Sequence, residues 1–182
     1  MLKQILVVVS LLILSCTSSV VIRDGFPLLN ANDNTATCII LNVEGNFNEF
    51  VPIYIDRKCV AGVQDTSIAT FEVEPGEHYL IAALDNQSVK KINFKAGKLY
   101  FVKMGTLEVP MFDGVRIELI SKEDGLARID SLKRRLKYVS LNPEVKFEDY
   151  DEKDYKEEME EYKNWEKENK EDAIKLLEYE GY

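Results

Sequence analysis

Histidine, cysteine and long apolar runs are all scarce in this 182-residue chain, and the scarcity of histidine excludes several kinds of site. His78 is the only histidine, so no zinc or di-iron site with two histidine ligands can form within the chain. One imidazole allows one catalytic triad at most, and no G-x-S-x-G segment supplies a nucleophile. The sequence therefore predicts that the protein is not an enzyme and that it binds no metal ion and no cofactor. Because His78 follows the turn Pro75-Gly76-Glu77, we expect its ring to cap backbone groups or to pack at one end of the fold.

The one long apolar run, Ile5 to Leu14, follows Lys3 and precedes Ser15 and Cys16. It is shorter than the about 20 residues that cross a bilayer as a helix, and its length is typical of the apolar part of a signal peptide. A small residue directly before a cysteine resembles the lipobox of bacterial lipoproteins, in which the cysteine is lipidated and the chain is cut before it. We therefore expect residues 1–15 to be a signal peptide and Cys16 to carry covalent lipid, such as palmitate. An ordinary secretory signal and an uncut membrane anchor are the alternatives.

The expected location is the bacterial cell envelope, with the membrane as a partner through the N-terminal lipid. Two or more acyl chains anchor a protein stably, because each buried methylene contributes roughly 0.8 kcal/mol. Thr17 follows Cys16, in place of the aspartate that retains lipoproteins in the inner membrane of enteric-type bacteria. This favours the outer membrane.

Negative charge is concentrated in the last quarter of the sequence. Residues 144–182 carry 16 acidic and 7 basic side chains, whereas residues 16–143 carry 16 and 15. A nearly neutral body with an acidic tail gives no electrostatic basis for binding nucleic acid. We therefore expect no nucleic-acid partner.

Short segments rich in β-formers, separated by turn residues, fill residues 37–120. In residues 115–119 three apolar side chains alternate with two charged ones, which is the period of a half-buried strand. The expected fold is mainly β, an antiparallel β-sandwich of about 7–8 strands and of the Ig-like or transthyretin-like type, over residues 37–138 with a closing helix. The polar, turn-forming residues 16–36 predict a tether before it. The candidate strands are residues 37–43, 51–55, 59–63, 68–73, 78–85, 88–94, 99–104 and 114–121.

Three segments carry a resemblance to a family, and they are VPIYIDRKCVAGV, FEVEPGEHYLIAAL and INFKAGKLYFVKM. In this order they resemble an uncharacterised β-sandwich domain of bacterial lipoproteins, related to PEGA-type modules, over residues 37–135. Asp-Arg-Lys replaces the family's more usual Asp-Gly-Lys in the first hairpin, so a type I′ turn cannot be assumed there. The resemblance implies a fold and a location but no catalytic residues. The matching positions are Tyr54, Asp56, Gly62, Phe71, Pro75, Gly76, His78, Ala96, Gly97, Lys98 and Tyr100.

Two helical segments are expected after the strands. The first, residues 125–138, should pack on the sandwich edge with Asp124 as its cap, and it is indicated by the helical spacing of Leu126, Ile129, Leu132 and Leu136. The second, about residues 151–178, is a long acidic helix interrupted at Asn169, within a C-terminal extension of residues 139–182. Its cluster of glutamates fans over more than one face, so we expect a solvated face rather than a metal site. These glutamates are Glu157, Glu158, Glu160 and Glu161.

The long helix carries an aromatic stripe made of Tyr155, Met159, Tyr162 and Trp165. Such a stripe either packs back on the sandwich or binds a partner, which would be an envelope protein or polymer. An exposed apolar stripe of this size is unusual in a monomer. The sequence leaves both interpretations open.

Cys38 and Cys59 remain once Cys16 is lipidated, and they form an even pair in an oxidising compartment. A disulfide between them requires their α-carbons to lie within about 7 Å of each other. Because the sequence does not show which strands are neighbours, it is compatible both with a disulfide and with two separate thiols.

Two hypotheses about function follow. In the first, the chain is a non-enzymatic, membrane-anchored lipoprotein, and its sandwich and C-terminal helix are a structural and interaction module of the envelope. In the second, it is a glycan- or small-ligand-binding module that uses exposed aromatic rings, such as Tyr54, Tyr100 or Trp165, as stacking platforms.

Overall fold

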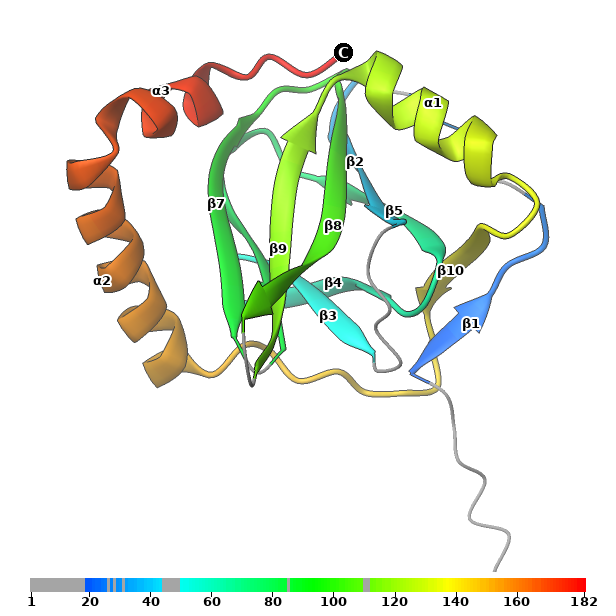
Figure 1. Ribbon diagram of the computed structural model, residues 1–182, viewed down its shortest axis with the longest axis horizontal. Helices are drawn as coiled ribbons and strands as arrows, with labels where there is room; N and C mark the ends of the chain where they lie inside the picture. The colour runs from blue at the N-terminus through cyan, green and yellow to red at the C-terminus, as the bar shows by residue number, and fades with distance from the viewer. Residues whose placement is uncertain are drawn as a thin grey trace, which may run out of the picture.

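The computed structural model describes residues 19–25, 27, 29–30, 32–43, 50–84, 86–109 and 112–182, with residues 107–109 and 112–113 described by their backbone alone. Cys16 and the expected signal peptide lie outside the described residues. Figure 1 shows the arrangement of the strands and helices. In chain order they are β1 (Val20–Ile22), β2 (Ala36–Asn42), β3 (Val51–Ile55), β4 (Lys58–Val63), β5 (Ser67–Val73), β6 (Gly76–Ala83), β7 (Gln87–Phe94), β8 (Leu99–Val109), β9 (Phe112–Ile120), α1 (Lys122–Leu132), β10 (Lys137–Leu141), α2 (Glu152–Glu168) and α3 (Lys170–Glu178).

The strands form two sheets, and the chain is mainly β as predicted. The larger sheet has six strands in the order β1-β10-β5-β2-β8-β9, and the smaller has four in the order β4-β3-β6-β7. Most neighbours are antiparallel, but β10 runs parallel to β5 and β2 runs parallel to β8. Between β2 and β8 the chain forms all four strands of the smaller sheet and also β5 of the larger one.

The two sheets face each other across the main hydrophobic core. Cys38 and Ile40 of β2 point into this core, where Ile53 of β3 and Leu80 of β6 meet them from the smaller sheet. The intervening Ile39 points to the opposite face of the larger sheet. All seven residues of β2 are buried. Both faces of the larger sheet are therefore covered at its centre.

Helix α1 covers the outer face of the larger sheet. Its Ile129 packs against Ile39 and Phe101 there. Gly125 is buried, and a Cβ atom at this position would overlap the Phe101 ring, so the glycine lets the helix approach the sheet closely. The helix begins earlier than predicted, because the Ser121 hydroxyl accepts a hydrogen bond from the Asp124 N–H at 3.0 Å. The prediction of Asp124 as the cap is therefore wrong. The predicted packing on the sandwich edge is also wrong, because Ile129 packs on the face of the larger sheet.

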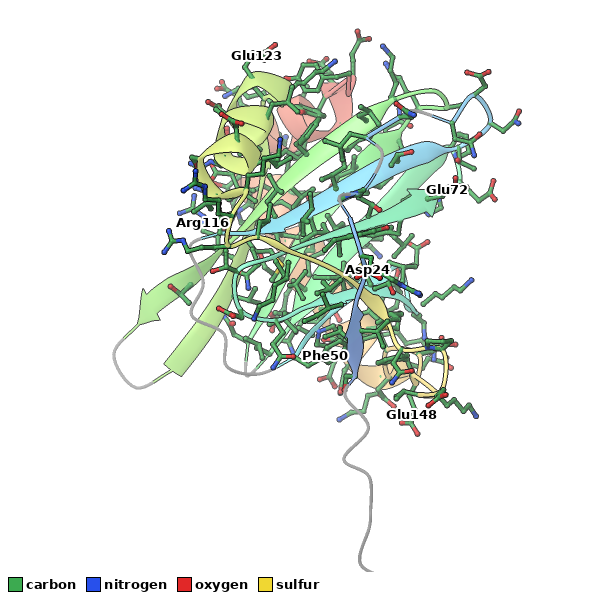
Figure 2. The ribbon with its side chains drawn as sticks, turned by 90° about the vertical axis from the view of Figure 1, so that its right-hand side faces the viewer. Asp24, Phe50, Glu72, Arg116, Glu123 and Glu148 are labelled. Atoms are coloured by element: carbon green, nitrogen blue, oxygen red, sulfur yellow. The ribbon has the colours of Figure 1, made fainter. Side chains whose placement is uncertain are left out.

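Helices α2 and α3 run along the smaller sheet and form, with the residues that flank them, a C-terminal arm of residues 151–182 (Figure 1). Asp151 caps α2, since its carboxylate accepts hydrogen bonds from the Lys153 and Asp154 N–H groups at 2.8 and 3.1 Å. The predicted interruption at Asn169 is confirmed, because this residue separates the two helices. Figure 2, turned by 90°, shows Glu123 of α1 at the upper end of the domain and Glu148, which precedes the arm, near the lower end.

The predicted strands agree with β2–β9, within two residues at each end except for β8, which extends five residues further than predicted. Two strands among the described residues were not predicted. β1 lies inside the predicted tether, with Val20 buried and Val20–Ile22 paired with β10. β10 lies where the first helix was expected to end, so the predicted boundary after residue 138 cuts through this strand. Each is short and is held mainly by pairing, which local periodicity does not reveal.

Candidate functional site

The aromatic stripe packs on the chain's own smaller sheet. Met159 and Tyr162 are buried, while Tyr155 and Trp165 are half-buried. Met159 lies in a cluster with Ile81 of β6 on the outer face of the sheet. The Tyr155 and Tyr162 rings both meet Tyr79, at centroid distances of 6.4 and 5.7 Å. Of the two interpretations of the stripe, packing on the sandwich is the one that these contacts support.

The arm also covers the edge of the smaller sheet at β7. The Tyr162 hydroxyl accepts a hydrogen bond from the Lys91 N–H at 3.2 Å, which satisfies a donor on this edge strand. Further along, the Tyr179 hydroxyl donates to the Ile120 carbonyl at 2.7 Å. Tyr182 then pairs with Leu99 through two backbone hydrogen bonds of 2.7 and 2.9 Å. The arm therefore links the edge of one sheet to strands β8 and β9 of the other.

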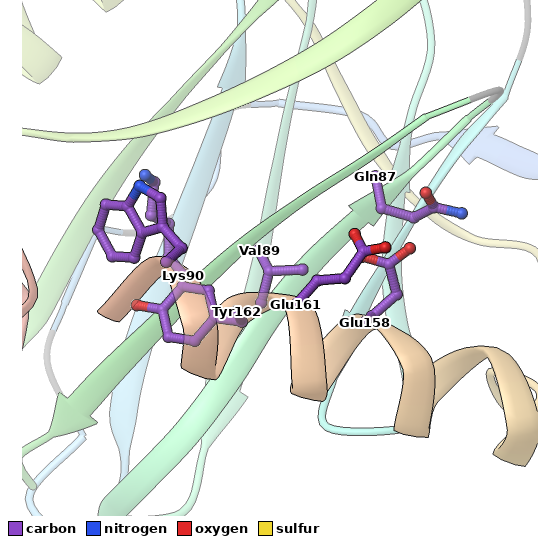
Figure 3. A pocket seen from close by; sticks show the side chains of 7 residues that line it. Gln87, Val89, Lys90, Glu158, Glu161 and Tyr162 are labelled. Carbon is purple, nitrogen blue, oxygen red and sulfur yellow. The ribbon is translucent and has the colours of Figure 1, made fainter. Parts of the chain in front are cut away.

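A groove of about 280 Å³ lies between β7 and α2 (Figure 3). The carboxylates of Glu158 and Glu161 lie next to each other at one end of it, close to Gln87 of β7. Partial burial, and then repulsion from Glu161, raises the pKa of Glu158. At the other end the Lys90 ammonium lies 5.5 Å from the centroid of the Trp165 ring. Glu158 is half-buried here, whereas the other three glutamates of the cluster are exposed, as predicted for a solvated face.

The three aromatic residues considered as stacking platforms are not free rings on the surface. Tyr100 is fully buried in the main core, where its hydroxyl accepts from the Lys95 N–H at 2.9 Å, so its proposed exposure is wrong. The Tyr54 ring packs edge-on against Tyr150 at 5.0 Å. The Trp165 ring contacts Tyr162 at 5.3 Å in addition to Lys90.

Cys38 and Cys59 are separate thiols, so the possible disulfide is not formed. Cys38 points into the core between the sheets. Cys59 lies opposite Tyr54 in the β3–β4 pair, and Tyr54 packs on the outer face of the smaller sheet, so this sheet separates the two sulfur atoms. Burial raises the pKa of both thiols, that of Cys59 to about 11.

The position where lipid is expected lies four residues before the first buried strand residue. Cys16 itself is outside the described residues, but Ser19 and β1 are described. The Ser19 carbonyl accepts a hydrogen bond from the Asn142 N–H at 3.1 Å, and Val20 lies opposite Leu141 in the β1–β10 pair. Folded structure thus begins almost directly after the expected anchor.

An aspartate and the only histidine form a pair at the turn between β3 and β4. The Asp56 carboxylate accepts from the Tyr79 N–H at 3.0 Å through Oδ1 and from His78 Nδ1 at 2.8 Å through Oδ2. Because a carboxylate only accepts hydrogen bonds, Nδ1 carries the hydrogen and Nε2 of the neutral ring is an acceptor. Asp56 has a φ of 54°, a left-handed conformation that costs about 1–2 kcal/mol for an L-residue. Arg57 shows no positive φ, so the turn is not type I′.

This pair lines a cavity of about 460 Å³, which is the size of a small-molecule site. The apolar part of its lining consists of Ile55, Val60 and Val73. Besides His78, the ionisable side chains that line it are the carboxylates of Asp56, Glu72, Glu74 and Asp149 and the cations of Arg57 and Lys58. Thr35 also lines the cavity, but its hydroxyl oxygen is buried away from it, without a hydrogen-bond partner among the described residues. Leaving a buried polar group unpaired costs about 1–3 kcal/mol.

The sequence-based expectation for His78 was a ring that caps backbone groups or packs at one end of the fold. The ring does pack against Phe94, with centroids 6.2 Å apart, but its polar partner is the Asp56 side chain. This pair was not predicted, because the two residues meet only through the pairing of β3 with β6. The change from glycine to Arg57 gave no local signal of the pair, because Arg57 shows no positive φ and the residue in the left-handed conformation is Asp56.

Among the described residues no group of three or more histidine, cysteine, aspartate and glutamate side chains is placed to hold a metal ion. None of the described helices has the length and apolar character needed to span a membrane. Neither a protein-family model, nor a curated protein, nor a solved structure matches the chain.

Proposed function

We propose that this chain is a lipid-anchored, non-enzymatic lipoprotein of the bacterial cell envelope, in the outer membrane, and that its two-sheet domain is an interaction module held directly at the membrane surface. The observation that carries the proposal is the short distance along the chain between Cys16 and the buried, paired Val20. Four extended residues reach at most about 14 Å. A lipid on Cys16 therefore keeps strand β1 next to the headgroups.

The position of β1 also orients the rest of the domain. In Figure 1 β1 and β10 lie on the opposite side of the sheets from α2. An anchor at β1 leaves the exposed face of α2 accessible to another envelope protein or polymer, with exposed residues such as Glu157 and Glu160 as contacts.

The finer classification is part of the same proposal. We infer an Ig-like or transthyretin-like sandwich related to PEGA-type modules. Residues that carry this resemblance lie at turns: Asp56 has a φ of 54°, Gly76 a φ of 134° and Gly97 a φ of 73°. Conformations with positive φ favour glycine or aspartate, which supports the assignment of these turns.

Metabolic labelling with an alkyne analogue of palmitate tests the anchor. The full chain should incorporate the label and fractionate with membranes, whereas Cys16→Ser should lose both properties. Cys59→Ser, which removes a half-buried thiol, is the matched control and should be labelled normally. Label that persists in Cys16→Ser would overturn the assignment of the lipid to this residue.

A second experiment tests the distance between β1 and the membrane. A fluorescent maleimide is placed on exposed Asp24→Cys, or on exposed Glu160→Cys of α2, in a Cys59→Ser background. In vesicles that contain headgroup quenchers, the label near β1 should be quenched more strongly than the label on α2. A 20-residue Gly/Ser insertion between Cys16 and Ser19 should remove most of this difference. Equal quenching at both positions without the insertion would contradict the proposal.

The groove of Figure 3 supports a second candidate function, the binding of a glycan or other small polar ligand. Paired carboxylates and the amide of Gln87 are suitable acceptors and donors for hydroxyl groups, and the Trp165 ring at the other end would report occupancy. Titration with muropeptides and oligosaccharides should then give a saturable change in tryptophan fluorescence that Glu161→Gln weakens. No saturable change would remove this candidate.

A further inference from the structure

The cavity beside the Asp56–His78 pair has both an apolar and a polar lining. It joins an apolar lining of three side chains to a group of hydrogen-bond acceptors whose positions are fixed by the fold. Asp56 is held by hydrogen bonds to both His78 and Tyr79, and its own N–H donates to the Tyr79 carbonyl at 2.8 Å. These hydrogen bonds hold the pair in position, and in the neutral ring the hydrogen on Nδ1 leaves Nε2 as the acceptor.

The charges around the cavity select among ligand classes. Four carboxylates line it against two cations. One of these cations, Arg57, is already engaged, since its Nε donates to the Tyr150 carbonyl at 3.0 Å and its Nη1 lies 3.6 Å from a Glu152 oxygen. An anionic ligand such as a phosphate would meet an excess of negative charge. The described residues also hold no cluster that suits a metal ion.

We propose that this cavity binds a primary ammonium group carried on a short apolar chain, the chemistry of a free lysine side chain in a peptide. An ammonium has three donors and no acceptor, and the cavity offers acceptors of two kinds. These are the imidazole Nε2 of His78 and the carboxylate of Glu74. The methylenes of the ligand would lie against Ile55 and Val60. The inference does not depend on the lipid anchor.

The experiment titrates the purified full chain with n-butylammonium chloride at constant ionic strength and follows the imidazole resonances of His78, which are unambiguous because there is no other histidine. We expect a saturable shift. Butanol and butyrate, which match the ligand in size but lack its charge or reverse it, should bind at least about tenfold more weakly. No saturable shift, or equal binding of the three probes, would overturn the proposal.

One variant connects the shift to the cavity. Glu74→Gln removes an exposed charge with little risk to folding. It should raise Kd for butylammonium about twofold to fivefold, because an exposed charged contact is weak. Glu144→Gln, an exposed carboxylate outside the cavity, is the matched control and should leave Kd unchanged. A control that weakens binding as much as Glu74→Gln would show general charge attraction instead. Cys16→Ser should bind normally, which separates this test from that of the anchor.

Discussion

Met159→Ala tests whether the C-terminal arm is part of the folded core. Met159 is only 6% exposed and packs on the outer face of the smaller sheet with Ile81 and Tyr150. Truncating a buried methionine to alanine costs about 2–5 kcal/mol, through lost burial and the cavity left behind. Because α2 is packed on one side only and can settle toward the sheet, we expect the lower half, about 2–3 kcal/mol. Each kcal/mol lowers Tm by about 2–4 °C for a chain of this size, so Tm should fall by roughly 4–12 °C.

The assay is thermal unfolding followed by two probes, the fluorescence of Trp165 and the far-ultraviolet circular dichroism of the whole chain. Trp165 is the only tryptophan and lies on the same helix, so its signal reports the arm. We expect both transitions to move together, as in two-state unfolding. Glu160→Ala changes the exposed neighbour and should stay within about 0.5 kcal/mol of the wild type. An unchanged Tm for Met159→Ala, or a shift in fluorescence alone, would refute the reasoning, because the arm would then be separate from the core.

Three further predictions concern other parts of the fold. Gly125→Ala should lower the free energy of unfolding in urea by about 1–3 kcal/mol, because the added methyl overlaps the Phe101 ring. This loss is the net effect after alanine gains roughly 1 kcal/mol in helix propensity. A stabilised variant would contradict the packing of α1. Glu158→Gln should raise the free energy of unfolding at pH 7, and by less toward pH 4.5. The pKa of Glu158 is raised in the folded state, so the wild type loses stability as the pH rises through this pKa and the carboxylate becomes charged. A gain in stability that does not depend on pH would contradict this. Cys59 should react slowly with iodoacetamide at pH 7, and its rate should rise about tenfold per pH unit up to pH 10, since burial raises its pKa to about 11. Mass spectrometry measures the labelling, and fast labelling at pH 7 would argue against burial.

The strands of the two sheets were largely predictable, because alternation and turn residues are local signals. In β9, apolar Val115 and Ile117 alternate with charged Arg116 and Glu118, so one face is specified by the sequence itself. β8 shows the limit of this reasoning. Tyr100 points to the main core while Phe101 points to α1, and both are fully buried, so polarity does not distinguish the two faces.

The contacts between distant segments could not be predicted in the same way. Leu136 continues the helical spacing of Leu132, yet the helix ends at Leu132 and the following residues pair with β1 and β5. The Asp56–His78 pair depends on the register of β3 against β6, which no periodicity reports. The stripe of α2 was visible from its spacing, but only the contacts of Met159 show what it packs against.

The pairing of β1 with β10 has a consequence for the order in which the chain folds. Val20 finds its partner in Leu141, about 120 residues later in the sequence. At a synthesis rate of about 5–20 residues per second, the first strand waits roughly 6–24 s before its partner exists. Contacts this far apart also slow folding after synthesis. Strand β1 therefore stays without its partner until residue 141 has been synthesised, and this edge of the larger sheet is the last part of the sheet to be completed.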